Sequence, residues 1–142
     1  MIRLAAAGDA EQLAALNEAF NGPGEATPEH VAESLRNNRQ EIVVVAEEGA
    51  ELAGFLCVQI KRSFCYENPT AEITEVYVKP AFRGRGIAGR MIAFAEAYCA
   101  RNGSISEFVL LTGEDNRAAQ SVYRRLGYAQ DRELHFTKRL RG

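Results

Sequence analysis

The chain has 142 residues, a size typical of one domain, and we expect residues 1–142 to form a single domain. Its hydrophobic fraction of 46% and charged fraction of 25% are ordinary for a globular protein and exclude a disordered or collagen-like chain. The net charge of −2 argues against a nucleic-acid or membrane-surface binder, because such proteins are usually basic.

The cysteines and histidines predict neither a disulfide framework nor a metal site. Cys57, Cys65 and Cys99 are odd in number and show no CxxC spacing, and His30 and His135 add too few ligands for zinc. The N-terminal residues lack the basic flank and long apolar core of a signal peptide. No apolar run approaches the ~20 residues needed to cross a bilayer. We therefore expect a reducing, cytoplasmic compartment.

The first part of the chain predicts a strand followed by two helices. Residues 2–5 are short and apolar enough for a first strand. Asp9 and Gln12 have the spacing of a capping box, and apolar residues then recur at helical intervals as far as the turn-forming residues 21–24. A second helix is expected to begin with Pro28 at its first position, directly after a threonine cap.

Three strands and a long helix are predicted next. Residues 42–47 and 51–62 read as strands joined by a turn, and residues 71–78 form a further strand. A loop rich in glycine and arginine then leads into the most regular helical pattern of the chain. Its apolar face consists of Ile87, Met91, Phe94, Ala95 and Tyr98.

The last part predicts a buried strand, a helix and a closing hairpin. Residues 108–111 are an unbroken apolar run, which is typical of a central strand. Asn116 is expected to cap a helix that Gly127 ends, and residues 128–130 and 134–140 are expected to pair as two strands. The order of elements predicts an α/β (α+β mixed) fold, a twisted mixed sheet of about six to seven strands with helices on both faces.

The glycine-rich loop is the first candidate site. Gly84, Gly86 and Gly89 allow the backbone to pass close to a ligand, and a helix begins beside them. The first amides of that helix, at the positive end of its dipole, favour phosphate or pyrophosphate. Three arginines add positive charge there: Arg83, Arg85 and Arg90. Taken alone, the loop is almost as compatible with a plain tight turn.

The same glycines also form the G-x-G-x-x-G fingerprint of dinucleotide-binding proteins. That interpretation fits less well, because five residues separate the strand end at Val78 from Gly84, whereas the fingerprint starts at the strand end. The short strands expected after the last helix also cannot supply a second mononucleotide-binding half.

A different pattern, Arg83-x-x-Gly86-x-Ala88, avoids these faults. It resembles the pyrophosphate loop R/Q-x-x-G-x-G/A of the Gcn5-related N-acetyltransferase (GNAT) superfamily. A strand ending V-Y-V-x-P precedes the loop, as in that family. The run N-R-A-A-Q-S-V-Y-R-R-L-G-Y, residues 116–128, is similar to the family's N-x-x-A-x-x-x-Y-x-x-x-G-F/Y helix. The clear resemblance covers roughly residues 71–128, and the expected order of elements agrees with a GNAT-like fold throughout.

The resemblance implies acetyl-CoA as cosubstrate, an amine as acceptor and no metal. In such proteins the strand before the loop carries a bulge that leaves backbone groups free for the pantetheine arm and the thioester, a role that falls here to Val76, Tyr77 and Val78. Asn116 would contact the coenzyme. The pyrophosphate would be held by backbone amides of the loop and the helix start, namely Arg83, Gly84, Arg85, Gly86, Ile87, Ala88, Gly89 and Arg90.

The resemblance also implies a general acid and a general base. Tyr123 would protonate the departing thiolate, although a thiol near pKa ~8.5 already leaves fairly well. On the helical pattern alone, Tyr123 reads as a core tyrosine. Glu72 stands where some members carry a catalytic glutamate. Glu75, three residues further on, would point to the opposite face of a regular strand unless a bulge intervenes. Glu75 or water could remove the proton instead, and Glu72 would then be an ordinary solvated carboxylate.

The predicted acceptor is the primary amine of a small molecule. The segments that shape the acceptor cleft in the family contain Glu25, Glu29, Tyr66 and Glu67, which suit a cationic amine. A peptide or protein amine is an alternative, as is a non-catalytic acyl-CoA-sensing module. Leu111 stands where members that acetylate ribosomal-protein N-termini carry a glutamate, which counts against that subgroup. Neither nucleic acid nor membrane is expected as a partner, and a homodimer is compatible with the sequence.

Overall fold

A computed structural model describes residues 1–141 and divides them into two compact units, Met1–Leu111 and the residues from Thr112 onward. The first unit contains β1 (Ile2–Leu4), α1 (Ala10–Asn21), α2 (Pro28–Asn37), β2 (Glu41–Glu48), β3 (Glu51–Lys61), β4 (Thr70–Val78), α3 (Ile87–Gly103) and β5 (Phe108–Leu110). The second unit contains α4 (Arg117–Arg125).

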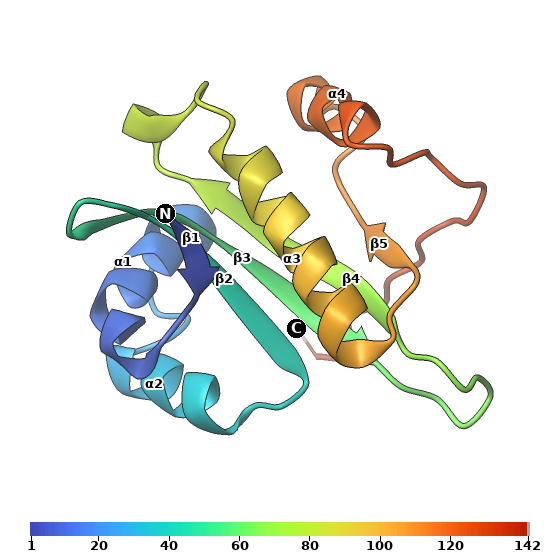
Figure 1. Ribbon diagram of the computed structural model, residues 1–142, viewed down its shortest axis with the longest axis horizontal. Helices are drawn as coiled ribbons and strands as arrows, with labels where there is room; N and C mark the ends of the chain where they lie inside the picture. Colours follow the sequence, from blue (N-terminus) through green and yellow to red (C-terminus); the bar gives the residue numbers. More distant parts are fainter. Residues whose placement is uncertain (142) are drawn as a thin grey trace. The chain divides into compact units, whose positions relative to one another are not determined.

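The strands form one sheet in the order β1-β2-β3-β4-β5 (Figure 1). Strands β1 to β4 pair antiparallel with one another, whereas β5 lies parallel to β4 because α3 carries the chain back along the sheet. This mixed sheet confirms the predicted α/β class.

Helices cover both faces of this sheet. On one face, Leu13 and Leu16 of α1 pack against Val45, Phe55 and Cys57. On the other face α3 lies across the sheet, in contact with β2 and β3 (Figure 1). It buries the side chains of Ile87, Met91, Ile92, Ala95 and Cys99. Because successive strand residues point to opposite faces, the central residues of β2 and β3 are buried whichever way they point.

The capping box predicted for Asp9 and Gln12 is wrong. The carboxylate of Asp9 accepts hydrogen bonds from the Arg3 guanidinium at 2.8 and 2.9 Å and from the amide of Ala6 at 2.8 Å. Gln12 instead reaches the turn between β2 and β3, where its Oε1 accepts from the amide of Leu52 at 2.8 Å. A guanidinium within reach is a stronger partner for the carboxylate than a neutral amide, so the long-range contact prevails.

The predicted closing hairpin is also wrong for the described residues. Residues 128–130 and 134–140 form no strand, and the sheet has five strands rather than six to seven. The alternating side chains of Leu134, Phe136 and Leu140 are 78%, 85% and 86% exposed. Apolar alternation indicates that a segment can form a strand, but the strand exists only when a neighbour supplies its ladder hydrogen bonds.

Candidate functional site

The glycine-rich loop opens directly onto the start of α3. Gly84 and Gly86 adopt positive φ values of 79° and 76°, and Gly86 is the residue that caps the helix. The first helical hydrogen bond runs from the amide of Arg90 to the carbonyl of Gly86 at 3.1 Å. The amides of residues 87–89 therefore have no acceptor within the helix and lie at the positive end of its dipole. Free amides at the start of a helix are the feature on which the predicted anion site depends, and the site stays a prediction.

The arginines of the loop remain at the surface. Arg83 bends back, so that its Nε donates to the carbonyl of Val78 at 2.8 Å and its guanidinium lies 5.7 Å from the centre of the Tyr77 ring. The guanidinium of Arg85 lies 5.3 Å from the centre of the Phe82 ring. Aromatic faces thus orient both cations without neutralising them, and the loop keeps its positive charge.

Strand β4, which leads into this loop, contains a β-bulge. Ile73 lies opposite Val58 of β3, but Glu75 lies opposite Cys57, so Thr74 is an extra residue. Strand β5 pairs with β4 only as far as Ile73. Within the described residues, the rest of β4 therefore has a ladder partner on its β3 side alone. The backbone of Val76, Tyr77 and Val78 therefore has no strand partner on its other side, where the carbonyl of Val78 accepts from Nε of Arg83.

The bulge also changes the faces to which the two β4 glutamates belong. Glu72 lies opposite Gln59 and Glu75 lies opposite Cys57. Gln59 and Cys57 are two residues apart on β3, so they share a face, and their partners share it with them. Both glutamates therefore project toward the side covered by α1 and α2, although their spacing of three would separate them on a regular strand.

The two glutamates have different partners on that face. Glu72 forms an ion pair with Lys61. Glu75 accepts a hydrogen bond from Nδ2 of Asn21 at 3.1 Å, and the same Nδ2 donates to Oδ1 of Asn17 at 2.8 Å. Glu75 lines a cavity between the helices and the sheet, whereas Glu72 lies outside the lining of that cavity.

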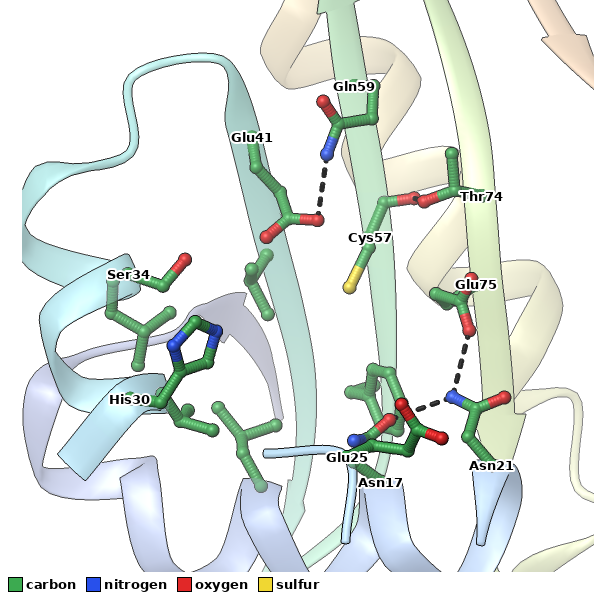
Figure 2. A pocket seen from close by; sticks show the side chains of 15 residues that line it. Asn17, Asn21, Glu25, His30, Ser34, Glu41, Cys57, Gln59, Thr74 and Glu75 are labelled. Atoms are coloured by element: carbon green, nitrogen blue, oxygen red, sulfur yellow. Dashed lines mark hydrogen bonds between the residues drawn. The ribbon is translucent and has the colours of Figure 1, made fainter. Parts of the chain in front are cut away.

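This cavity has a volume of about 670 Å³ and is bounded by α1, α2, β2, β3 and β4 (Figure 2). Three carboxylates lie in its wall, from Glu25, Glu41 and Glu75, and no lysine or arginine of the described chain lines it. Its apolar wall is formed by Leu13, Val31, Leu35, Val43 and Phe55. A pocket of this size with a few convergent polar groups is typical of a small-molecule site.

Burial controls the protonation of two groups in the cavity. The carboxylate of Glu41 accepts a hydrogen bond from Nε2 of Gln59 at 3.0 Å. Burial raises the pKa of Glu41, and the nearby charge of Glu75 acts in the same direction. Burial also raises the pKa of Cys57 well above its ordinary value, so Cys57 is a protonated thiol at neutral pH rather than a nucleophile.

The acceptor residues expected from the sequence are only partly brought together. Glu25 lines the cavity, but Glu29 does not, and Tyr66 and Glu67 lie in the exposed loop between β3 and β4. No sequence pattern selects the other polar residues of the cavity as acceptor residues: Asn17, Asn21, His30, Ser34, Glu41, Cys57, Gln59 and Thr74. A usable signal was the position of Glu41 and Gln59 at the polar ends of two otherwise apolar strands.

The second unit contains the remaining predicted residues. Oδ1 of Asn116 accepts from the amide of Ala119 at 3.2 Å, which confirms its role as the cap of α4. Tyr123 is half-buried, its ring centre lies 6.4 Å from that of Tyr128, and burial raises its pKa. Its hydroxyl therefore keeps its proton at neutral pH, as a general acid must before it acts.

Two kinds of feature are absent from residues 1–141. No group of three or more His, Cys, Asp or Glu side chains in this range is arranged to hold a metal ion. None of the helices in the same range is long and apolar enough to span a membrane.

Comparison with known proteins identifies the family. The model of the acetyltransferase (GNAT) family matches residues 11–128. The chain belongs to the GNAT family. Relatives in this family are named as N-acetyltransferases, enzymes that move an acetyl group from acetyl-CoA to an amine.

Relatives of this GNAT chain include two bacterial acetyltransferases. It is 30% identical over 94 residues to the uncharacterized N-acetyltransferase YhfO of Bacillus subtilis (strain 168), covering 66% of this chain and 62% of that protein, less than two thirds of its length. It is 26% identical over 124 residues to aminoglycoside N(6')-acetyltransferase type 1 of Salmonella typhimurium (strain LT2), covering 82% and 84% of the two chains.

Among solved structures, the fold matches that of aminoglycoside N-acetyltransferase AAC(6')-Iy in complex with CoA. The TM-score is 0.83 at 20% identity, and the match covers 99% of this chain and 94% of that one. At this level of identity the likeness shows the fold alone.

Proposed function

We propose that this protein is an acetyl-CoA-dependent N-acetyltransferase that acts on the primary amine of a small molecule. The observation that carries the proposal is the position of β4. One end of this strand leads into the anion-binding loop, its bulge leaves backbone groups open, and Glu75 beside the bulge lines the acidic cavity. A cosubstrate and an amine acceptor can therefore meet along one strand.

The chain's residues suit coenzyme A in three ways. The free amides at the start of α3 and the charge of the loop arginines fit a pyrophosphate. A Cβ placed on Gly84 or Gly86 would meet no atom within 4 Å, so the loop leaves space for the phosphates. The open side of Val76–Val78 fits the amide groups of a pantetheine arm. We extend the binding site to Asn116 on the strength of the sequence motif.

The acceptor must reach the thioester as a neutral amine. An alkyl ammonium has a pKa near ~10, so a proton must be removed before the nitrogen attacks the carbonyl carbon and the C–S bond breaks. Glu72 is the base that the sequence favours. Glu75 is the alternative that lines the cavity, with its carboxylate oriented by Asn21. Tyr123, which holds its proton at neutral pH, returns a proton to the departing thiolate.

The test is release of free thiol from acetyl-CoA in the presence of polyamines, aminoglycosides, amino acids and peptides. We expect release with one or more small amines. Binding of CoA without thiol release from any of these acceptors would instead identify an acyl-CoA-sensing module, and release with peptides alone would identify a peptide acetyltransferase.

The two glutamates are separated by a matched pair of variants, Glu72→Gln and Glu75→Gln. Whichever carboxylate is the base, its replacement should lower kcat about 10²-fold or more, with the loss greatest at low pH. The other variant serves as the control. If both variants lower kcat only slightly and equally, water rather than either glutamate accepts the proton of the amine.

A further inference from the structure

The acceptor cavity carries more negative charge than a monoamine requires. Glu25, Glu41 and Glu75 line it, and none of the ion pairs formed within residues 1–141 involves these three carboxylates. Glu75 is held by the amide of Asn21 and Glu41 by the amide of Gln59, both of which are neutral donors. Among the described residues, no lysine or arginine lines the cavity to balance these carboxylates, and His30 is the one basic side chain in its lining.

Glu41 and Glu75 occupy opposite walls of this cavity. Glu41 is on β2 and Glu75 is on β4, with β3 between them, so two strand spacings of about 4.8 Å separate them. Glu41 lies opposite Gln59 and Glu75 opposite Cys57, a further offset of two residues along β3. Their Cα atoms are therefore about 12 Å apart.

Both side chains point into the same space. Figure 2 shows the carboxylates of Glu41 and Glu75 on either side of Cys57, facing the cavity from the two flanking strands. Glu75 lies beside the bulge and the open edge of β4, whereas Glu41 lies two strands away from that edge. Glu41 is thus too far from the expected thioester to act on the reacting amine, but it faces the other end of the same cavity.

We infer that the acceptor carries at least two amino groups and that Glu41 binds the ammonium group that is not acetylated. This inference rests on the proposed function, because it assumes that the cavity holds the acceptor. Glu41 is then a specificity-determining residue. A dication placed between the two walls balances both carboxylates, while the apolar wall that includes Val43 contacts the carbon chain between the amines. Burial of Glu41 strengthens the pairing, because water competes less for a half-buried carboxylate.

The experiment compares acceptors that differ only in the second charge. We would measure kcat/KM by thiol release for 1,4-diaminobutane, 4-amino-1-butanol and butylamine at saturating acetyl-CoA. A charge-assisted hydrogen bond in a partly buried site supports a preference of about tenfold or more for the diamine over both monoamines. A diamino sugar in the same series distinguishes an alkyl diamine from an amino-sugar acceptor.

Variants of Glu41 then test whether this residue causes the preference for the diamine. Glu41→Gln keeps the shape and the contact with Gln59 but removes the charge, so the ratio of diamine to monoamine should fall to near one. Glu41→Asp should restore part of it. Glu11→Gln is the matched control, because Glu11 is exposed on α1 and lies outside the cavity lining. A wild-type ratio near one, or a wild-type ratio retained in Glu41→Gln, would overturn the inference while leaving the acetyltransferase proposal intact.

A binding measurement separates the two proposals if no amine is turned over. In that case the acetyltransferase proposal fails, and calorimetric titration of the CoA-loaded protein with 1,4-diaminobutane and butylamine tests the cavity by itself. Diamine binding that is weakened about tenfold or more in Glu41→Gln supports the assignment of Glu41. Binding of neither amine, or of both equally, refutes it.

Discussion

Gly54 on β3 allows the end of β4 to approach closely. Its replacement should displace this part of β4, which we propose to bind coenzyme A. Gly54 lies opposite Val78. A Cβ at this position would lie 2.4 Å from the carbonyl oxygen of Tyr77 and 3.1 Å from Cα of Val78. These are backbone atoms, so no side-chain rotation can relieve the contact. Gly54→Ala must therefore displace the segment of β4 that we propose to bind coenzyme A.

The size of this effect follows from the contact. Ordinary van der Waals contact to a Cβ begins near 3.4 Å, so the strands must separate by about 1 Å. Overpacking of this kind costs about 1–3 kcal/mol, which corresponds to a fall in Tm of roughly 3–10 °C for a chain of this length. A displacement of about 1 Å at the binding strand should also weaken CoA binding by about tenfold or more.

Thermal unfolding and calorimetric titration with CoA measure the two effects. Gly8→Ala is the matched control, because a Cβ there meets no atom within 4 Å and Gly8 does not have a positive φ. We expect the control to match wild type in both measurements. A Gly54→Ala protein with wild-type Tm and wild-type CoA affinity would show that β4 tolerates the shift and that this reasoning is wrong.

Three further predictions concern the loop, the proposed acid and the cavity. Gly86→Glu should abolish CoA binding in calorimetry, whereas Gly86→Ala should mainly cost about 1–2 kcal/mol of stability from the left-handed backbone; unchanged CoA affinity in folded Gly86→Glu would move the phosphate site elsewhere. Tyr123→Phe should lower kcat by about 10²-fold with little change in Tm, and a lower Tm with unchanged kcat would instead mark Tyr123 as a core tyrosine. Because burial raises the pKa of Glu41, its ionised form destabilises the folded state above that raised pKa, and the penalty disappears below the ordinary carboxyl pKa. Glu41→Gln should therefore be more stable than wild type at pH 8, by less than about 1 kcal/mol after solvent screening, and should show no gain at pH 4; equal shifts in melts at the two pH values would refute this.

The sequence by itself determined the features that depend on neighbours along the chain. Pro28 and the threonine before it predicted the start of α2, and Oγ1 of Thr27 indeed accepts from the amide of His30 at 3.1 Å. Asn116 caps α4 as predicted, and Gly86 opens α3. The loop motif and the residue 116–128 motif likewise identified the family. A cap or a tight turn involves a few consecutive residues, so its chemistry is readable without knowledge of the fold.

Tertiary structure decided the features that depend on strand pairing. The capping partner of Gln12 is on the turn between β2 and β3, and the segment 134–140 is not a strand because the described chain pairs nothing with it. The bulge at Thr74 depends on how β4 meets β3, and it alone brings Glu72 and Glu75 to one face. The alternation of side chains along a strand predicts which face each one lies on only where the strand has no bulge. Since register is set by the partner strand, the acidic cavity could be recognised only once β2, β3 and β4 were paired.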